Sequence, residues 1–126
     1  FFTVVGPAKN VDDKDVNAYS LILKMTYQNK NVLFTGDINQ ESELKLQNVK
    51  ADILKVAHHG SNTSSNPKFI AKVHPTISVI QVGRNNKYGH PSQEVVERLK
   101  KYSQVYTTAS QGEVKIKIYQ DAIKVE

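Results

Sequence analysis

The middle of the sequence passes abruptly from an apolar run into a polar turn, in the stretch Ile53-Leu54-Lys55-Val56-Ala57-His58-His59-Gly60-Ser61. The apolar run from Ile53 to Ala57 is short, which is typical of a buried β-strand. The paired histidines then follow the end of that strand. Loops at the carboxyl ends of strands are where α/β folds usually assemble ligands, so this stretch indicates both a core element and a candidate site.

Upstream, two runs with alternating apolar residues predict a β-hairpin. They extend from Ser20 to Tyr27 and from Asn31 to Thr35, and they are separated by Gln28-Asn29-Lys30. The second run leads into Gly36-Asp37. The aspartate is therefore expected just after a strand, as the two histidines are.

Downstream, the run from Ile77 to Val82 predicts another strand, which leads into a loop from Gly83 to Pro91 that is rich in turn-forming residues. If the three strands are neighbours in one sheet, their loops converge and bring the aspartate and three of the four histidines together. The side chains in the third loop that can carry chemistry are Arg84, Lys87, Tyr88 and His90.

Three short helices and a terminal hairpin complete the predicted elements. Glu41 and Glu43 stand in the first turn of the first helix, near the positive end of its dipole. The third helix is expected from Gln93 to Tyr102, and the alternation from Val114 to Val125 predicts the hairpin. The interleaved strands and helices predict the α/β class, with a mixed sheet and flanking helices. The residues expected to cap the three helices are Asn39, Asn66 and Ser92.

Composition limits the class of protein. The 126 residues are 39% hydrophobic and 23% charged, which fits one globular domain. No run approaches the roughly 18 to 20 apolar residues that span a bilayer, so no membrane contact is expected from these residues. The formal charge of +5 favours phosphate-bearing partners such as nucleic acid.

A divalent metal site is one interpretation of the aspartate and histidine cluster. The chain has no cysteine, so imidazole and carboxylate are the remaining ligands, and they suit zinc, manganese or iron. A carboxylate such as that of Asp37 can bridge two cations. The alternative interpretation is structural, because a Gly-Asp pair after a strand is also typical of a turn. His74 is left out of the site, since it is expected at a helix end.

Four further residues are candidates for substrate binding. Arg84 and Tyr88 could hold a phosphate ester, although a solvated loop has the same composition. Lys55 could point into the site or pair with Asp52 across the strand end. The hydroxyl of Ser61 could bind phosphate oxygens.

Four blocks of the sequence are specific in their order and spacing. Together they resemble the metallo-β-lactamase domain of ComEC-type competence proteins. The phosphorylcholine esterases of the same superfamily share a similar Thr-Gly-Asp and His-His-Gly-Ser pair. The blocks are Asn17-Ala18-Tyr19-Ser20-Leu21-Ile22-Leu23, Leu33-Phe34-Thr35-Gly36-Asp37, Leu54-Lys55-Val56-Ala57-His58-His59-Gly60-Ser61 and Val82-Gly83-Arg84-Asn85-Asn86-Lys87-Tyr88-Gly89-His90-Pro91.

The resemblance implies a four-layer αββα fold with a dinuclear site for two divalent ions, zinc or manganese. Residues 1–126 would form the C-terminal portion of a single domain of this fold. Asp37 matches the bridging aspartate, and His58 matches the later metal-binding histidine, with His59 as the alternative. His59 and His90 are the candidates for catalytic roles, and His90 could also bind metal.

The principal metal motif of the superfamily, His-x-His-x-Asp-His, is absent from this sequence. We expect it to precede Phe1, in an N-terminal half of the domain that would be a partner of these residues. Asp37 and one or two histidines are too few ligands for a tightly held dinuclear centre. We therefore expect this chain by itself to be metal-poor and inactive. We also expect an exposed apolar face, through which the chain could form a homodimer.

The implied activity is phosphodiester hydrolysis, with DNA as the substrate during competence-related uptake. This function would place the intact protein outside the cytoplasm or at a membrane. One alternative is an esterase for a small phosphodiester such as phosphorylcholine. The other is a non-catalytic domain that binds nucleic acid or a partner protein. The absence of tryptophan argues against an aromatic cage for choline, which favours DNA.

Overall fold

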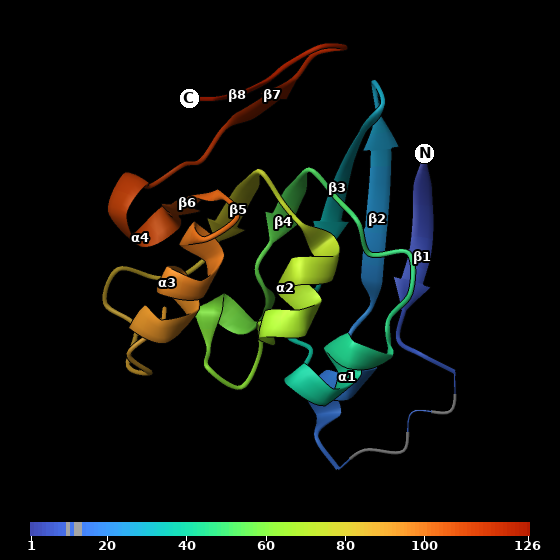
Figure 1. Cartoon of the computed structure of the whole chain (residues 1–126). Coiled ribbons are helices and arrows are strands. Elements are labelled where there is room, and N and C mark those ends of the chain that lie inside the picture. Colours follow the sequence, from blue (N-terminus) through green and yellow to red (C-terminus); the bar gives the residue numbers. More distant parts are fainter. Residues whose placement is uncertain (10, 12–13) are drawn as a thin grey trace.

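A six-stranded mixed sheet crosses the molecule in the order β1-β2-β3-β4-β5-β6 (Figure 1). The computed structural model describes residues 1–9, 11 and 14–126. The first three strands pair antiparallel, and β3, β4, β5 and β6 pair parallel. The strands are β1 (Phe2–Gly6), β2 (Ile22–Tyr27), β3 (Lys30–Phe34), β4 (Ile53–Lys55), β5 (Ile77–Ile80) and β6 (Gln104–Thr107).

One face of the sheet is covered by helices, which stand in front of it in Figure 1. Phe69 and Ile70 in α2 and Leu99 in α3 pack in the same buried cluster as Leu33 and Leu54 of the sheet. This cluster is the main core of the protein. The helices are α1 (Gln40–Lys45), α2 (Pro67–Val73), α3 (Gln93–Lys100) and α4 (Thr108–Gln111), with 3-10 turns η1 (Val16–Tyr19) and η2 (Ala57–Gly60).

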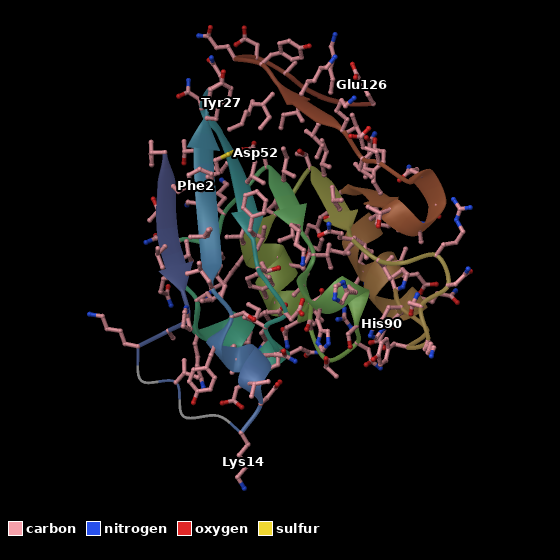
Figure 2. The ribbon with its side chains drawn as sticks, turned by 180° about the vertical axis from the view of Figure 1, so that it is seen from behind. Phe2, Lys14, Tyr27, Asp52, His90 and Glu126 are labelled. Atoms are coloured by element: carbon pink, nitrogen blue, oxygen red, sulfur yellow. The ribbon has the colours of Figure 1, made fainter. Side chains whose placement is uncertain are left out.

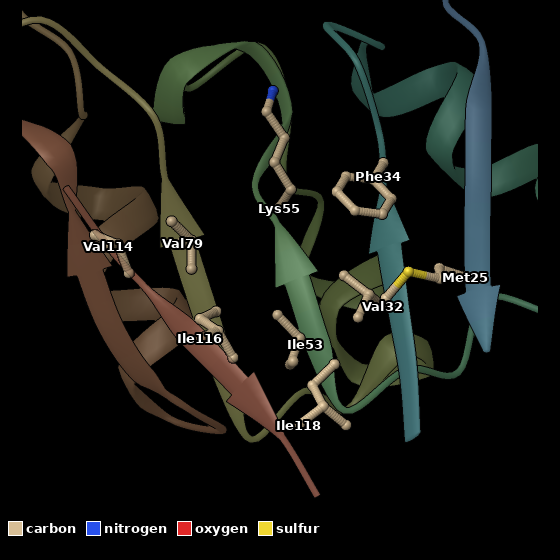
Figure 3. A pocket seen from close by; sticks show the side chains of 9 residues that line it. All are labelled: Met25, Val32, Phe34, Ile53, Lys55, Val79, Val114, Ile116 and Ile118. Carbon is tan, nitrogen blue, oxygen red and sulfur yellow. The ribbon is translucent and has the colours of Figure 1, made fainter. Parts of the chain in front are cut away.

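The opposite face of the sheet is only partly covered, by the antiparallel hairpin of β7 (Ile116–Ile118) and β8 (Ile123–Val125). The hairpin packs on a second cluster around Val32, Ile53 and Ile77. A pocket of about 280 Å³ remains between hairpin and sheet, with Lys55 at the end opposite Ile118 (Figure 3). Two apolar side chains of β1 are exposed: Phe2 is 63% accessible and Val4 67%.

The structure confirms the α/β prediction of a mixed sheet with flanking helices. The first hairpin turns through Gln28 and Asn29, whose φ angles of 50° and 59° suit a tight turn between twisted strands. The side chain of Asn39 accepts a hydrogen bond from the Ser42 amide, and that of Asn66 accepts one from the Lys68 amide, so both caps are confirmed. The terminal hairpin is confirmed as well.

Several boundaries differ from the prediction. The strand expected from Ile77 to Val82 ends at Ile80, because Val82 exchanges backbone hydrogen bonds with the Thr108 hydroxyl instead of a strand. The Ser92 side chain makes no capping hydrogen bond, and α3 ends at Lys100 rather than Tyr102. Strand β6 and helix α4 were not predicted. In the part of the chain that the structure describes, no helix is long and apolar enough to cross a membrane.

The core assignment predicts unequal costs for two leucine truncations. Leu99 is fully buried between α3 and the sheet, whereas Leu21 is 56% exposed. We expect Leu99→Ala to lower the free energy of unfolding by about 2–5 kcal/mol, because it leaves a cavity. Leu21→Ala is the matched control and should change it by about 0.5 kcal/mol or less. Urea unfolding followed by circular dichroism measures both, and equal costs would contradict the packing.

Candidate active site

The ends of β3, β4 and β5 meet at one edge of the sheet because these strands run parallel. This is the lower edge in Figure 2, where His90 is labelled. The Nε2 atom of His59 lies 3.9 Å from Oδ2 of Asp37. The ring of His58 lies 6.2 Å from that of His59 and 6.0 Å from that of His90, centroid to centroid. The structure thus brings together the aspartate and the three histidines that the sequence placed after separate strands.

The histidine turn has an unusual backbone. His58, His59 and Gly60 have φ angles of 48°, 55° and 79°, in the left-handed region. For a residue with a Cβ this conformation costs roughly 1–2 kcal/mol. Glycine is required at position 60 for a steric reason as well, because a Cβ there would stand 2.6 Å from Cβ of Pro91.

Backbone hydrogen bonds across the sheet edge hold this turn. The His58 amide donates to the Gly36 carbonyl at 3.2 Å, so the histidine turn is tied to the turn that carries Asp37. The Ser92 amide donates to the Gly60 carbonyl at 2.9 Å and ties it to the start of α3. Strained backbone that the surroundings hold in place is common at functional sites.

His59 has a fixed tautomer. Its Nδ1 lies 2.7 Å from the Gln81 carbonyl oxygen, and because a carbonyl only accepts, Nδ1 carries the proton. In the neutral ring, Nε2 then carries the lone pair, on the side of Asp37. Metal-binding histidines commonly have this arrangement, with the second nitrogen donating to a backbone carbonyl. Nδ1 of His58 instead lies 3.5 Å from the Thr63 hydroxyl, a longer contact.

Lys55 is directed at the Asp37 turn rather than at Asp52. Its ammonium donates to the Gly36 carbonyl at 3.3 Å, while the Asp52 carboxylate accepts from the Asn31 amide at 2.7 Å. Burial lowers the pKa of Lys55, and the charge of Asp37 opposes that shift. The structure therefore places a cation beside the candidate aspartate.

The loop after β5 is organised by Asn86. Its side-chain amide donates to the carbonyls of Gly83 and His90 and accepts from the amides of Tyr88 and His90. Arg84 is anchored to α4 by donation from Nε to the Ala109 carbonyl at 3.1 Å. Burial, and then the charges of the other two site histidines, lower the pKa of His90.

The hydroxyl of Ser61 is buried and engaged within its own loop. Ser61 is 4% exposed, and its Oγ lies 3.0 Å from the Thr63 hydroxyl and accepts from the Thr63 amide. These contacts order the segment next to His58. They do not present the hydroxyl to solvent, where a phosphate would arrive.

Glu43 has a structural role that its place in the first turn of α1 did not reveal. The side chain is fully buried, and its two oxygens accept from the amides of Ser65 and Asn66, each at 2.7 Å. These residues end the loop that follows the histidine turn. The Gln40 amide adds a bond to the Thr63 carbonyl at 3.0 Å. Helix α1, which follows Asp37, is thereby fastened to the loop that follows His58 and His59.

The described residues fit a metal ion only in part. Asp37 and His59 are 3.9 Å apart, within the separation that two ligands each about 2.0–2.2 Å from one ion can span. Across residues 1–9, 11 and 14–126, no group of three or more His, Asp or Glu side chains is placed to hold an ion. Among the described residues, the site thus offers two donors that one ion could share.

Comparisons with known proteins connect the chain to competence proteins. It is 39% identical over 106 residues, 81% of its length, to ComE operon protein 3 of Bacillus subtilis. It is 33% identical over 128 aligned residues, 99% of its length, to Recombination protein 2 of Haemophilus influenzae. Competence protein ComA of Neisseria gonorrhoeae is 35% identical over 97 residues, 73% of the chain. The matches cover 14%, 16% and 14% of these proteins, and no family model matches the chain.

The buried carboxyl of Glu43 predicts a pH-dependent stability. Burial raises its pKa from the ordinary value of 4.5 to about 7, against the opposing effect of the hydrogen bonds from Asn66 and Ser65 and the charge of Arg98. A carboxyl with a higher pKa in the folded chain stabilises the fold at low pH, and this contribution is lost as the pH rises through the folded pKa. We expect the free energy of unfolding to fall between pH 4.5 and about 7 by on the order of 3 kcal/mol.

Glu43→Gln provides the comparison, because an amide stays neutral at every pH. Urea unfolding of both proteins across this range gives the difference in their free energies of unfolding, and that difference removes the contribution of all other groups, which the two proteins share. The free energy of unfolding of the unaltered protein should fall relative to that of Glu43→Gln as the pH approaches 7, because the ionised, buried Glu43 is costly. A constant difference would contradict the raised pKa.

Proposed function

Because the chain is homologous to a segment of competence-related proteins of the ComEC family, we propose that it forms part of a metal-dependent phosphodiesterase that acts on DNA. The segment would be the C-terminal portion of a hydrolase domain of the metallo-β-lactamase type. The chain spans about one seventh of the length of its relatives. The activity proposed is that of the full-length protein.

The observation that supports this proposal best is the geometry of Asp37 and His59. Both side chains follow neighbouring parallel strands, and the Gln81 carbonyl fixes the histidine tautomer that leaves Nε2 free on the aspartate side. A purely structural Gly-Asp turn does not require a histidine in this tautomer. The left-handed backbone at His59 adds a cost that packing alone gives no reason for.

Asp37 and His59 would hold a divalent ion, zinc or manganese, with the other ligands supplied from outside the described residues. When bound, such an ion polarises a phosphoryl oxygen as a Lewis acid and activates water. His59 is the ligand that the tautomer favours, whereas the resemblance in sequence favours His58, with His59 as the alternative. The full-length protein would hold two such ions.

The other residues of the edge would act on the phosphodiester itself. His58 and His90 line the same edge, 6.0 Å apart between ring centroids, and imidazole N–H groups can donate hydrogen bonds to the ester oxygens. The ammonium of Lys55 lies beside the Asp37 turn and offsets its negative charge, so that a phosphate can approach. The formal charge of +5 favours approach of a polyanion.

The ligand count predicts weak metal binding by the 126-residue chain alone. Two donors cannot complete the four-coordinate shell that tightly bound zinc requires. Calorimetric titration with Zn²⁺ or Mn²⁺ should show weak binding that His59→Ala reduces more than His58→Ala does. Tight stoichiometric binding by the chain would contradict the partial-site assignment, and a larger loss with His58→Ala would reverse the choice of histidine.

Cleavage of single-stranded DNA by the full-length protein, with Mn²⁺ or Zn²⁺ present, tests the proposed activity. We expect Asp37→Asn and His59→Ala each to lower kcat/KM by roughly 100-fold or more, equivalent to about 3 kcal/mol. His74→Ala is the matched control, because His74 is an exposed histidine that caps α2 and packs against Tyr102. Unchanged activity in all three variants would refute the site.

A further inference from the structure

Tyr88 stands at the outer end of a row of rings that begins at the candidate site. Its ring stacks on that of His90, with centroids 5.8 Å apart and planes inclined by 18°. The His90 ring lies 6.0 Å from that of His58, which in turn lies 6.2 Å from that of His59. The row therefore extends from the side of Asp37 out into the loop after β5.

The second face of the Tyr88 ring is open. The residue is 82% exposed even though one face is stacked. A large aromatic ring in this position gains little from burial, so the fold of the chain alone does not account for it. Lys87, the preceding residue, is exposed as well, so the same loop also presents a cation to solvent.

The loop that carries Tyr88 is held in place from within. The Asn86 side chain accepts from the Tyr88 amide at 3.2 Å and from the His90 amide at 2.9 Å, and it donates to the His90 carbonyl at 2.6 Å. The backbone on both sides of the stack is thereby fixed. A ring that is already oriented loses less conformational entropy when a ligand covers it.

We propose that the free face of Tyr88 stacks on an unpaired nucleobase of a single-stranded substrate whose phosphodiester lies at the histidine edge. This inference rests on the proposed function and adds a specificity determinant to it. Nucleobases are flat aromatic rings, and proteins that bind single strands stack them on exposed aromatic side chains beside cations. In a duplex each base is stacked on both faces, so this surface selects against double strands.

Fluorescence anisotropy with the 126-residue chain tests the stacking without catalysis. The probe is a labelled oligothymidylate at low salt in EDTA, compared with an abasic strand of the same length and with a duplex. Tyr88→Leu removes the ring and keeps apolar bulk, whereas Tyr88→Phe keeps the ring. Tyr119→Leu is the matched control, because Tyr119 is 47% exposed and lies near a lysine, with Lys124 Nζ 5.6 Å from its ring centroid.

We expect Tyr88→Leu to weaken binding of oligothymidylate by about 5- to 150-fold, and Tyr88→Phe and Tyr119→Leu to change it by less than about twofold. The unaltered chain should bind the abasic strand and the duplex more weakly, and Tyr88→Leu should not weaken the abasic strand further. Equal binding of both single strands, or an equal loss with Tyr88→Phe, would overturn the stacking and leave the nucleic-acid function standing. No binding of any strand by the unaltered chain would overturn the stacking, whereas cleavage of DNA by the full-length protein tests the proposed function separately.

Discussion

The left-handed turn at His58, His59 and Gly60 is the constraint on which the rest of the site depends. An ordinary strand exit would carry the two histidines away from the sheet edge. The turn begins at His58, shortly after β4 ends at Lys55, and the His58 amide donates to the carbonyl of Gly36, directly before Asp37. One backbone hydrogen bond therefore sets the spacing between the two parts of the candidate metal site, and the cost of the backbone is met by the surrounding fold.

Buried polar contacts hold the segments next to this turn. Glu43 satisfies two amides at the end of the histidine loop, and the Ser64 hydroxyl donates to the Ile38 carbonyl at 2.6 Å. Buried polar groups rigidify a structure only when each has a partner. Among the described residues, every buried side-chain nitrogen and oxygen has one. The site is thus positioned by a complete network.

Much of the fold and the convergence of the site follow from local patterns. An apolar run that stops at Gly36-Asp37 or at His58-His59 predicts a strand end, and parallel strands place such ends together. The partners of these residues are not local. Glu43 bonds to residues 22 and 23 positions away, and the bond between His59 and Gln81 uses a backbone carbonyl that every residue possesses. Strand β6 (Gln104–Thr107) has only Val105 and Tyr106 as apolar signals, too few for a pattern.

The close contact between Gly60 and Pro91 has a consequence for how variation in relatives should be interpreted. A Cβ at Gly60 would stand 2.6 Å from Cβ and 3.2 Å from Cα of Pro91, so sterics require the glycine whatever the site does. Invariance at this position among homologues would accordingly mark an architectural requirement. Conservation of Asp37 and His59 would bear instead on the proposed metal site.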